Sequence, residues 1–155
     1  LPADQTGLLA VHRSDPGLML GYWNRPAEQA EVMRGDWFVG GDLASMDADG
    51  YVTHRGRAND LMKAMGFRVS PLEVEAVLAE HPLVGEVACA EVRVRADVSV
   101  IGAFIVPRDA AKPPSAEAIQ AFAAARLAPY KCPREVRIVA SLPRTPNGKL
   151  RRSAL

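Results

Sequence analysis

The sequence predicts an α+β fold, in which helices pack on a small three-stranded sheet, with a β-hairpin and further β-rich segments before it. Three observations lead to this class. After residue 70 the hydrophobic patterns follow the order helix, strand, strand, helix, strand. An Asp-Gly pair separates two strand-like stretches near residue 50. The chain has 155 residues, 48% of them hydrophobic, which suffices for one sizeable core and at most a small second unit.

Short elements are predicted in the first part of the chain. Residues 8–12 form an apolar run of the strand type. Pro26 suits the first turn of a helix, which we expect to continue to Met33 before Gly35 and Asp36 interrupt the pattern.

A β-hairpin is predicted around residue 50. Residues 43–46 and 51–54 have strand patterns, and Asp49-Gly50 between them is a strong signal for a tight turn. This acidic turn is not a calcium loop, because Tyr51 stands where an EF-hand requires an oxygen ligand.

A capping box predicts the first helix of the second half. Ser70 suits the N-cap, Pro71 the first turn, and Glu73 the return hydrogen bond to the backbone of the cap residue. We expect this helix to begin at Pro71 and to end at His81, because Pro82 disfavours helical geometry in the residue before it.

The remaining elements complete a module of about 95 residues. Residues 84–94 alternate partly, and residues 98–106 form a nearly continuous apolar run that suits a strand buried on both faces. We expect a helix over residues 116–127 and a third strand over residues 135–140. Residues 141–155 have the proline, glycine and basic content of an exposed tail.

Composition argues against several classes of function. Lys and Arg number 19 and Asp and Glu 18, so the bulk charge gives no reason to expect nucleic acid or an anionic membrane as a partner. Cys89 and Cys132 lie far apart without CxxC spacing, which argues against a metal site and for two buried thiols in a reducing compartment. No apolar run approaches the roughly 20 residues of a membrane helix, so we expect a cytoplasmic protein.

Three segments carry a resemblance to a known family. They are Trp37-Phe38-Val39-Gly40-Gly41-Asp42, the ribbon of residues 56–70 that begins Gly56-Arg57-Ala58-Asn59-Asp60, and Pro143-Arg144-Thr145-Pro146-Asn147-Gly148-Lys149. In this order they resemble the motifs of the adenylate-forming enzymes, which include acyl- and aryl-CoA ligases, peptide-synthetase adenylation domains and luciferases. The likeness is greatest to the acyl- and aryl-CoA ligases. It implies that a carboxylate and ATP form acyl-AMP and pyrophosphate, after which acyl-AMP and CoA form acyl-CoA and AMP.

The first half-reaction needs a positive charge near the oxygens that bridge the acid and the α-phosphate. Lys149 is the best candidate, because Pro143, Pro146 and Gly148 restrict its loop and lysine acts on phosphate as a point charge. The resemblance implies that Lys149 is catalytic in adenylate formation. The alternative is a solvated lysine in a basic tail.

Two further residues resemble nucleotide-binding positions. The resemblance implies that Asp42 accepts hydrogen bonds from the ribose hydroxyls and that Arg57 assists there. The alternatives are a turn aspartate that caps the hairpin and a surface arginine paired with Asp60. The family often has Thr-Gly-Asp where this chain has Gly40-Gly41-Asp42, which keeps the carboxylate but removes a hydroxyl.

Four residues of the ribbon are implied in domain alternation and in thioester formation. Asn59 falls at the hinge between two domains, where relatives often carry a charged residue. Lys63 resembles a catalytic position, Gly66 would let the backbone approach the pantetheine arm, and Arg68 would meet a phosphate of CoA. The alternatives are an exposed strand lysine for Lys63 and a turn glycine for Gly66.

The resemblance also implies that the chain is one part of such an enzyme. Residues 1–56 resemble the end of the large N-terminal domain, and residues 57–155 resemble the small mobile C-terminal domain. The sequence contains no Ser/Thr/Gly-rich phosphate loop, so we expect no activity from this chain alone and a large N-terminal domain as its partner. ATP or AMP and CoA are the implied cofactors, with Mg²⁺ bound outside these residues. Lys149 is open to regulatory acetylation.

Two other functions stay open. A peptide-synthetase adenylation domain would pass its acyl group to the phosphopantetheine of a carrier protein. A small binding module could use its basic residues on nucleic acid, although the chain lacks aromatic residues interleaved with basic ones, which single-strand binders use.

Overall fold

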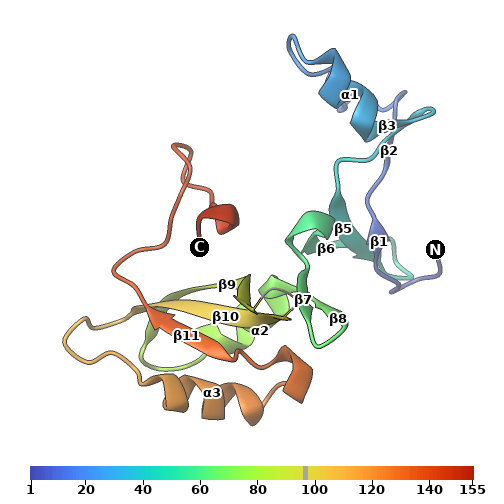
Figure 1. The fold of residues 1–155 in the computed structure, drawn as a ribbon. Helices are drawn as coiled ribbons and strands as arrows, with labels where there is room; N and C mark the ends of the chain where they lie inside the picture. Colours follow the sequence, from blue (N-terminus) through green and yellow to red (C-terminus); the bar gives the residue numbers. More distant parts are fainter. Residues whose placement is uncertain (96–97) are drawn as a thin grey trace. The chain divides into compact units, whose positions relative to one another are not determined.

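The computed structural model describes residues 1–95 and 98–155, and the chain divides into two units. Unit 1 comprises Leu1–Asn59 and unit 2 comprises Asp60–Leu155. Figure 1 shows unit 1 in blue to blue-green and unit 2 from green to red. The division falls three residues beyond residue 56, where the sequence predicts the boundary.

Unit 1 is built from short antiparallel strands and one short helix. Its two sheets have the strand orders β1-β5-β6 and β2-β4-β3. The apolar run of residues 8–12 does not form one strand, because its first half pairs with β5 and its second half with β4. In chain order the elements are β1 (Gly7–Leu8), β2 (Val11–His12), α1 (Pro26–Val32), β3 (Met33–Arg34), β4 (Trp37–Phe38), β5 (Asp42–Met46) and β6 (Val52–Arg57).

The predicted hairpin at Asp49-Gly50 is confirmed by the pairing of β5 with β6. Asp47 organises the turn, because its Oδ1 accepts hydrogen bonds from the backbone amides of Asp49 at 3.0 Å and Tyr51 at 2.9 Å. Gly50 has φ of 86°, a left-handed conformation that glycine adopts without steric cost.

Unit 2 has the predicted order of helices and strands. A 3-10 helix (Ala58–Asp60) crosses the boundary between the units, and two more 3-10 helices (Pro129–Lys131 and Arg152–Ala154) lie later in the chain. The other elements are β7 (Met62–Ala64), β8 (Phe67–Val69), α2 (Pro71–Ala79), β9 (Val84–Arg95), β10 (Val98–Pro107), α3 (Ala116–Ala124) and β11 (Glu135–Ile138).

The main sheet of unit 2 has the order β11-β10-β9. The central strand β10 runs antiparallel to β9 and parallel to β11. Its nearly continuous apolar sequence follows from this position, since residues 101–105 are buried on both faces of the sheet.

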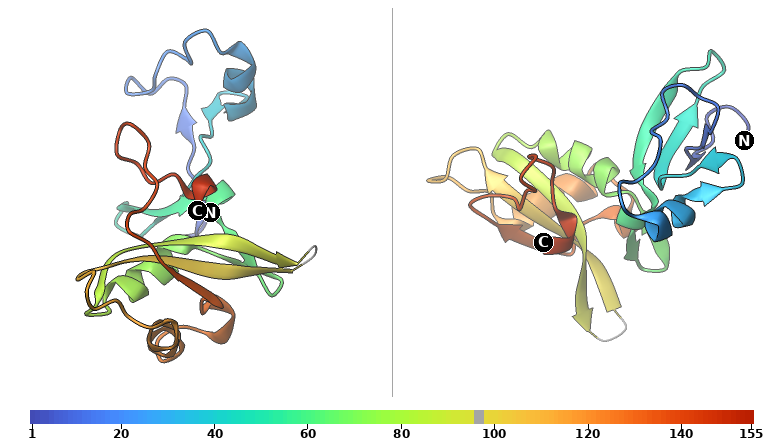
Figure 2. Two further views of the ribbon diagram at one scale, coloured as in Figure 1. Left: turned by 60° about the vertical axis from the view of Figure 1, so that its left-hand side comes forward. Right: turned by 90° about the horizontal axis from the view of Figure 1, so that it is seen from above.

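The two faces of this sheet bury different clusters. Cys89 of β9 points toward the helices and packs in a cluster with Leu78 of α2 and Ile119 of α3. The preceding residue, Ala88, points to the opposite face, where Leu142 of the C-terminal segment covers it. Figure 2 shows α2 and α3 on one side of the sheet and the C-terminal segment on the other.

The capping of α2 differs from its prediction. The helix begins at Pro71 as expected, but the side chain of Ser70 makes no cap hydrogen bond. Glu73 does not return to the cap and instead forms an ion pair with Lys131, which raises the pKa of that lysine. A charge-assisted hydrogen bond to an ammonium is stronger than a bond to a neutral amide, so tertiary contact overrides the local motif. By contrast, Ser115 caps α3 with a hydrogen bond of 3.1 Å.

The prediction of an exposed tail over residues 141–155 holds for most of the segment but is wrong at Leu142 and Arg152. Leu142 is 8% exposed, and the Arg152 side chain is 16% exposed. The Arg152 guanidinium forms an ion pair with Glu75 of α2, lies 3.6 Å from Asp60, and donates a hydrogen bond of 2.8 Å to the carbonyl of Cys89. Burial disfavours its charge, yet Glu75 and Asp60 outweigh that effect and raise the pKa of Arg152.

The two cysteines are free, but their surroundings differ. Cys89 is 0% exposed in the core, and burial raises the pKa of its thiol far above the usual range. The prediction of a buried thiol is confirmed for Cys89. Cys132 is only half-buried.

We expect Arg152→Ala to destabilise unit 2 by about 3 kcal/mol or more, because Glu75 would be left buried without its cation. Urea unfolding of the 155-residue chain measures this change. The matched control is Arg137→Ala, whose ion pair with Glu135 is exposed and should contribute about 1 kcal/mol or less. Equal effects of the two substitutions would contradict a structural role for Arg152.

A second expectation concerns thiol reactivity. Cys132 should react with a maleimide in the folded chain, whereas Cys89 should react only after unfolding, because it is inaccessible and its thiolate is disfavoured. Peptide mass spectrometry after a timed reaction distinguishes the two sites. Labelling of both cysteines at the same rate would show that the core around β9 opens readily.

Candidate functional site

In unit 1 the structure brings together the two residues predicted to bind nucleotide. Asp42 begins β5 and lies directly opposite Arg57 at the end of β6. The Arg57 Nε lies 3.3 Å from Asp42 Oδ1, and another Arg57 nitrogen donates to the carbonyl of Gly40 at 2.9 Å. These contacts set the orientation of the carboxylate and leave it 39% exposed. An exposed, oriented carboxylate can accept hydrogen bonds from paired hydroxyls.

The two residues of the alternative pairing, Arg57 and Asp60, each have a partner within their own unit. Asp60 instead lies beside Arg152, while Asp42 takes Arg57 as its partner. His54 adds a further contact, with Nε2 3.5 Å from Asp42 Oδ1. The sequence analysis missed His54, although its place two residues before Gly56 on β6 could have indicated it.

The first part of the ribbon in unit 2 is a tight hairpin formed by β7 and β8. Its turn residues, Met65 and Gly66, have φ of 51° and 84°. Two consecutive left-handed residues match a turn whose twist fits antiparallel strands, and they explain why a glycine stands there. A Cβ added to Gly66 would meet no atom within 4 Å, so the backbone conformation, rather than crowding within unit 2, favours glycine.

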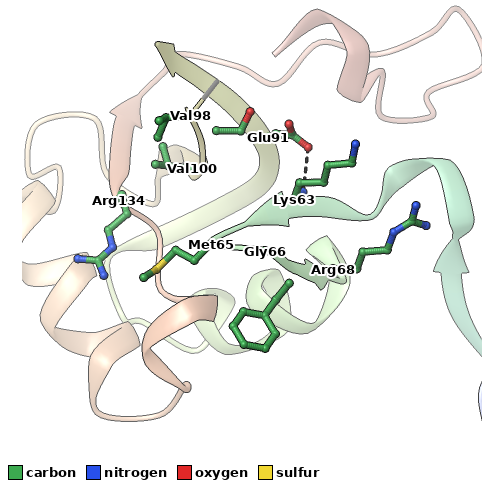
Figure 3. Close-up of a pocket in the computed structure, with 10 residues that line it drawn as sticks. Lys63, Met65, Gly66, Arg68, Glu91, Val98, Val100 and Arg134 are labelled. Carbon is green, nitrogen blue, oxygen red and sulfur yellow. Dashed lines mark hydrogen bonds between the residues drawn. The ribbon is translucent and has the colours of Figure 1, made fainter. Parts of the chain in front are cut away.

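Lys63, Gly66 and Arg68, all predicted to act in thioester formation, line one pocket of about 760 Å³. Lys63 and Arg68 are cross-strand partners on β7 and β8, and both are exposed. Figure 3 shows their side chains extending to the same side, with Arg134 across the pocket. Within residues 1–95 and 98–155, neither Lys63 nor Arg68 forms a salt bridge. Two adjacent cations disfavour each other and favour an anionic ligand.

Glu91 of β9 holds the hairpin against the main sheet. Its Oε2 accepts a hydrogen bond of 2.8 Å from the Lys63 backbone amide, drawn as the dashed line in Figure 3. Hydrogen bonds from Ser99 and from that amide lower the pKa of Glu91, so the carboxylate stays charged. The ammonium of Lys63 therefore remains available while its backbone is anchored.

Lys149 lies in a closed loop that we call the Lys149 loop, residues 143–151. The loop is closed by an antiparallel bridge between Arg144 and Leu150, and by a backbone bond of 2.8 Å from Thr145 to the carbonyl of Lys149. The amide of Lys149 also donates to Thr145 Oγ1 at 3.1 Å. The Lys149 side chain is exposed and forms no salt bridge in the described part of the chain.

The predicted residues thus form three groups. Asp42 and Arg57 are paired in unit 1, Lys63 lies with Gly66 and Arg68 at the pocket, and Lys149 stands in its own loop outside the pocket lining. Asn59 is the last residue of unit 1. The φ of Asn59 is not positive in this conformation. The left-handed backbone angle that asparagine tolerates is therefore not used here.

Two kinds of feature are absent from the residues that the structure describes. No helix there is long and apolar enough to span a membrane. No group of three or more His, Cys, Asp or Glu residues in residues 1–95 and 98–155 is placed to hold a metal ion.

Comparison with known proteins places this geometry in a family. The family model described as "AMP-binding enzyme C-terminal domain" matches residues 73–149, which run from α2 to Lys149. Residues 73–149 belong to this family. The predicted resemblance to adenylate-forming enzymes is thereby confirmed, together with the α+β fold class.

Curated relatives and solved structures extend the match beyond these residues. A long-chain-fatty-acid–CoA ligase of Bacillus subtilis is 39% identical over 90% of this chain, and a 3-hydroxybenzoate–CoA ligase of Aromatoleum is 36% identical over 98% of it. The chain spans only 25% and 29% of these two relatives. ATP-bound MatB from Rhodopseudomonas palustris has a TM-score of 0.88 at 31% identity, covering 99% of this chain and 30% of that protein. The AMP complex of MenE from Bacillus subtilis has a TM-score of 0.87 at 30% identity, covering 100% and 31%.

Sequence reasoning missed the residues that support the predicted ones. Glu91 and Arg134 reach the pocket from β9 and from the segment before β11, far from the ribbon in sequence. Glu86 and Arg144 contact each other beside the Lys149 loop, 58 residues apart. Long-range pairs of this kind leave no local signal in a single sequence.

Proposed function

We propose that this chain supplies the C-terminal part of an ATP-dependent acyl- or aryl-CoA ligase that forms AMP. The observation that carries the proposal is the position of Lys149. It is exposed on a closed loop, in the same unit as the exposed cations Lys63 and Arg68. The relatives' names support a CoA ligase, and their greater length supports a larger enzyme of which this chain is about a quarter to a third.

In adenylate formation, Lys149 supplies the cation. Its ammonium would lie beside the oxygens where the carboxylate attacks the α-phosphate, and so stabilise the charge that develops as pyrophosphate leaves. The absence of a salt bridge within the described residues suits this role, because a paired lysine would have to give up its partner first. Acetylation of this exposed amine would remove the charge and stop the step.

Asp42 and Arg57 hold the nucleotide in this proposal. The Asp42 carboxylate accepts hydrogen bonds from the two ribose hydroxyls, a geometry that its two oxygens match. Arg57 keeps the carboxylate oriented through its contact at 3.3 Å, and His54 supports it on the same oxygen.

Lys63, Gly66 and Arg68 serve thioester formation. The two exposed cations attract the phosphates of CoA toward the hairpin, while the turn at Gly66 lets the pantetheine arm pass close to the backbone. Lys63 is the residue of this group that acts nearest the reacting groups. Glu91 anchors its backbone but forms no salt bridge with its ammonium, which stays available.

The proposal assigns unit 1 to the end of a large N-terminal domain and unit 2 to a small domain that turns about Asn59. The division between Asn59 and Asp60 supports this hinge. The large domain would hold the triphosphate, Mg²⁺ and the acyl group. A cytoplasmic location completes the proposal and is supported by the two free cysteines, which suit a reducing compartment.

Replacement of Lys149 by alanine tests the first role. In the enzyme with its large domain present, Lys149→Ala should reduce adenylate formation roughly 100-fold or more, the effect of removing one preorganised charge. Thioester formation from supplied acyl-adenylate should be nearly unchanged. Single-turnover assays of each half-reaction measure both rates, and Lys112→Ala, at another exposed loop lysine, is the matched control. If both half-reactions slow equally, separate roles for Lys149 and the ribbon are excluded.

Replacement of Gly66 by asparagine tests the second role. Asparagine tolerates the left-handed φ and has open space at this position, so the hairpin should keep its fold. The added side chain should slow thioester formation at least about 10-fold, as a small misplacement of reactants can, and spare adenylation. Gly50→Asn is the control, because Gly50 has φ of 86° and equally open surroundings in the other unit. Normal thioester rates in Gly66→Asn would show that the glycine serves the turn alone.

A further inference from the structure

The Lys149 loop is attached to the main sheet by a contact that the proposed function does not use. Arg144 stands at the base of the loop, opposite Leu150. One nitrogen of its guanidinium donates a hydrogen bond of 2.9 Å to the carbonyl of Gly148, the residue before Lys149. Another nitrogen donates to Glu86 Oε2 and forms an ion pair with it.

Glu86 provides a fixed support for this arrangement. It lies near the start of β9 and pairs with Val106 of the central strand β10. The following residues of β9 include Ala88 and Cys89, both 0% exposed in the core. The backbone that carries Glu86 is therefore held by the sheet, and the contact with Glu86 attaches Arg144 to the sheet.

The chemistry of Arg144 suits a link between two acceptors. A planar guanidinium has five N–H donors in a fixed arrangement, so it can bind a carboxylate and a carbonyl in defined directions at the same time. A lysine at this position has a single nitrogen on a flexible stem and would set the direction less sharply. The two side chains are 49% and 50% exposed, and ion pairs this exposed contribute little to the stability of a fold.

We propose that Arg144, held by Glu86, is a positioning residue that sets the direction of Lys149 in adenylate formation. Gly148 has φ of 79°, in the left-handed region, and glycine has the widest backbone freedom of any residue. The hydrogen bond from Arg144 to the Gly148 carbonyl restrains the backbone at this point, directly before Lys149. The ammonium of Lys149 extends from the next residue, so its position depends on this carbonyl. The inference rests on the proposed function of Lys149 and goes beyond it by naming the pair that supports the lysine.

The test uses single-turnover adenylation by the enzyme with its large domain present. Arg144→Ala and Glu86→Ala should each reduce the rate of adenylate formation roughly 10-fold or more, because a displacement of about 1 Å can cost that much. The KM for ATP, the melting temperature and thioester formation from supplied acyl-adenylate should stay close to those of the unmutated enzyme. Glu86→Gln keeps an acceptor oxygen for Arg144 and should retain most of the rate. Arg137→Ala, which breaks an exposed ion pair elsewhere on the sheet, is the matched control.

A charge exchange separates positioning from ordinary ion pairing. The double variant Glu86→Arg with Arg144→Glu restores an ion pair but places no donor beside the Gly148 carbonyl, so adenylation should stay slow. Restoration of the rate by this exchange would overturn the proposal. So would normal adenylation in Arg144→Ala when Lys149→Ala is inactive, an outcome that leaves the proposed function intact. Normal adenylation in Lys149→Ala would instead refute the proposed function, and the inference with it.

A second measurement needs only the 155-residue chain. Hydrogen exchange at the amide of Lys149 should become faster in Arg144→Ala and stay unchanged in Arg137→Ala, since Arg144 holds the turn in which that amide is bonded to Thr145 Oγ1. Equal protection of this amide in both variants would contradict the proposal.

Discussion

The ion pair between Arg152 and Glu75 is the interaction on which the arrangement of unit 2 depends. Arg152 reaches back from the end of the chain to α2, to Asp60 at the start of the unit and to the carbonyl of Cys89 in the sheet. Glu75 in turn accepts a hydrogen bond of 2.6 Å from the amide of Cys89. Neither charge could remain buried without the other. The pair therefore holds the C-terminal segment in place and, with it, the loop that carries Lys149.

Two sets of cations in unit 2 differ in whether they have carboxylate partners. Arg152, Lys131 and Arg144 are paired with carboxylates and have structural or positioning contacts. Lys63, Arg68 and Lys149 are exposed and form no salt bridge within residues 1–95 and 98–155. Unpaired cations held on anchored backbone are suited to anionic ligands, because binding breaks no existing ion pair. Lys112 is also exposed and without a salt bridge in the described residues, so the anchored backbone of Lys63, Arg68 and Lys149 distinguishes them.

Much of the candidate site was predictable because its motifs are local. The turn glycine at Gly66 and the loop before Lys149 depend on residues within a few positions of each other, which a single sequence displays. The capping box at Ser70 was equally local, yet Glu73 binds Lys131, 58 residues away, and not the cap. The basic composition of residues 141–155 suggested exposure, whereas Leu142 covers the sheet and Arg152 is half-buried. Composition averages over residues and cannot identify the one arginine that finds a buried partner.

The sequence by itself determined the order of helices and strands in unit 2, the hairpin turns, the central buried strand β10 and the family. These follow from hydrophobic period, turn chemistry and motif order, all of which act over short stretches of chain. Only the tertiary structure decided which charges meet: Arg57 with Asp42, Arg152 with Glu75 and Asp60, and Arg144 with Glu86. The physical reason is that an ion pair depends on distance in space, and strand pairing brings together residues that the sequence keeps far apart.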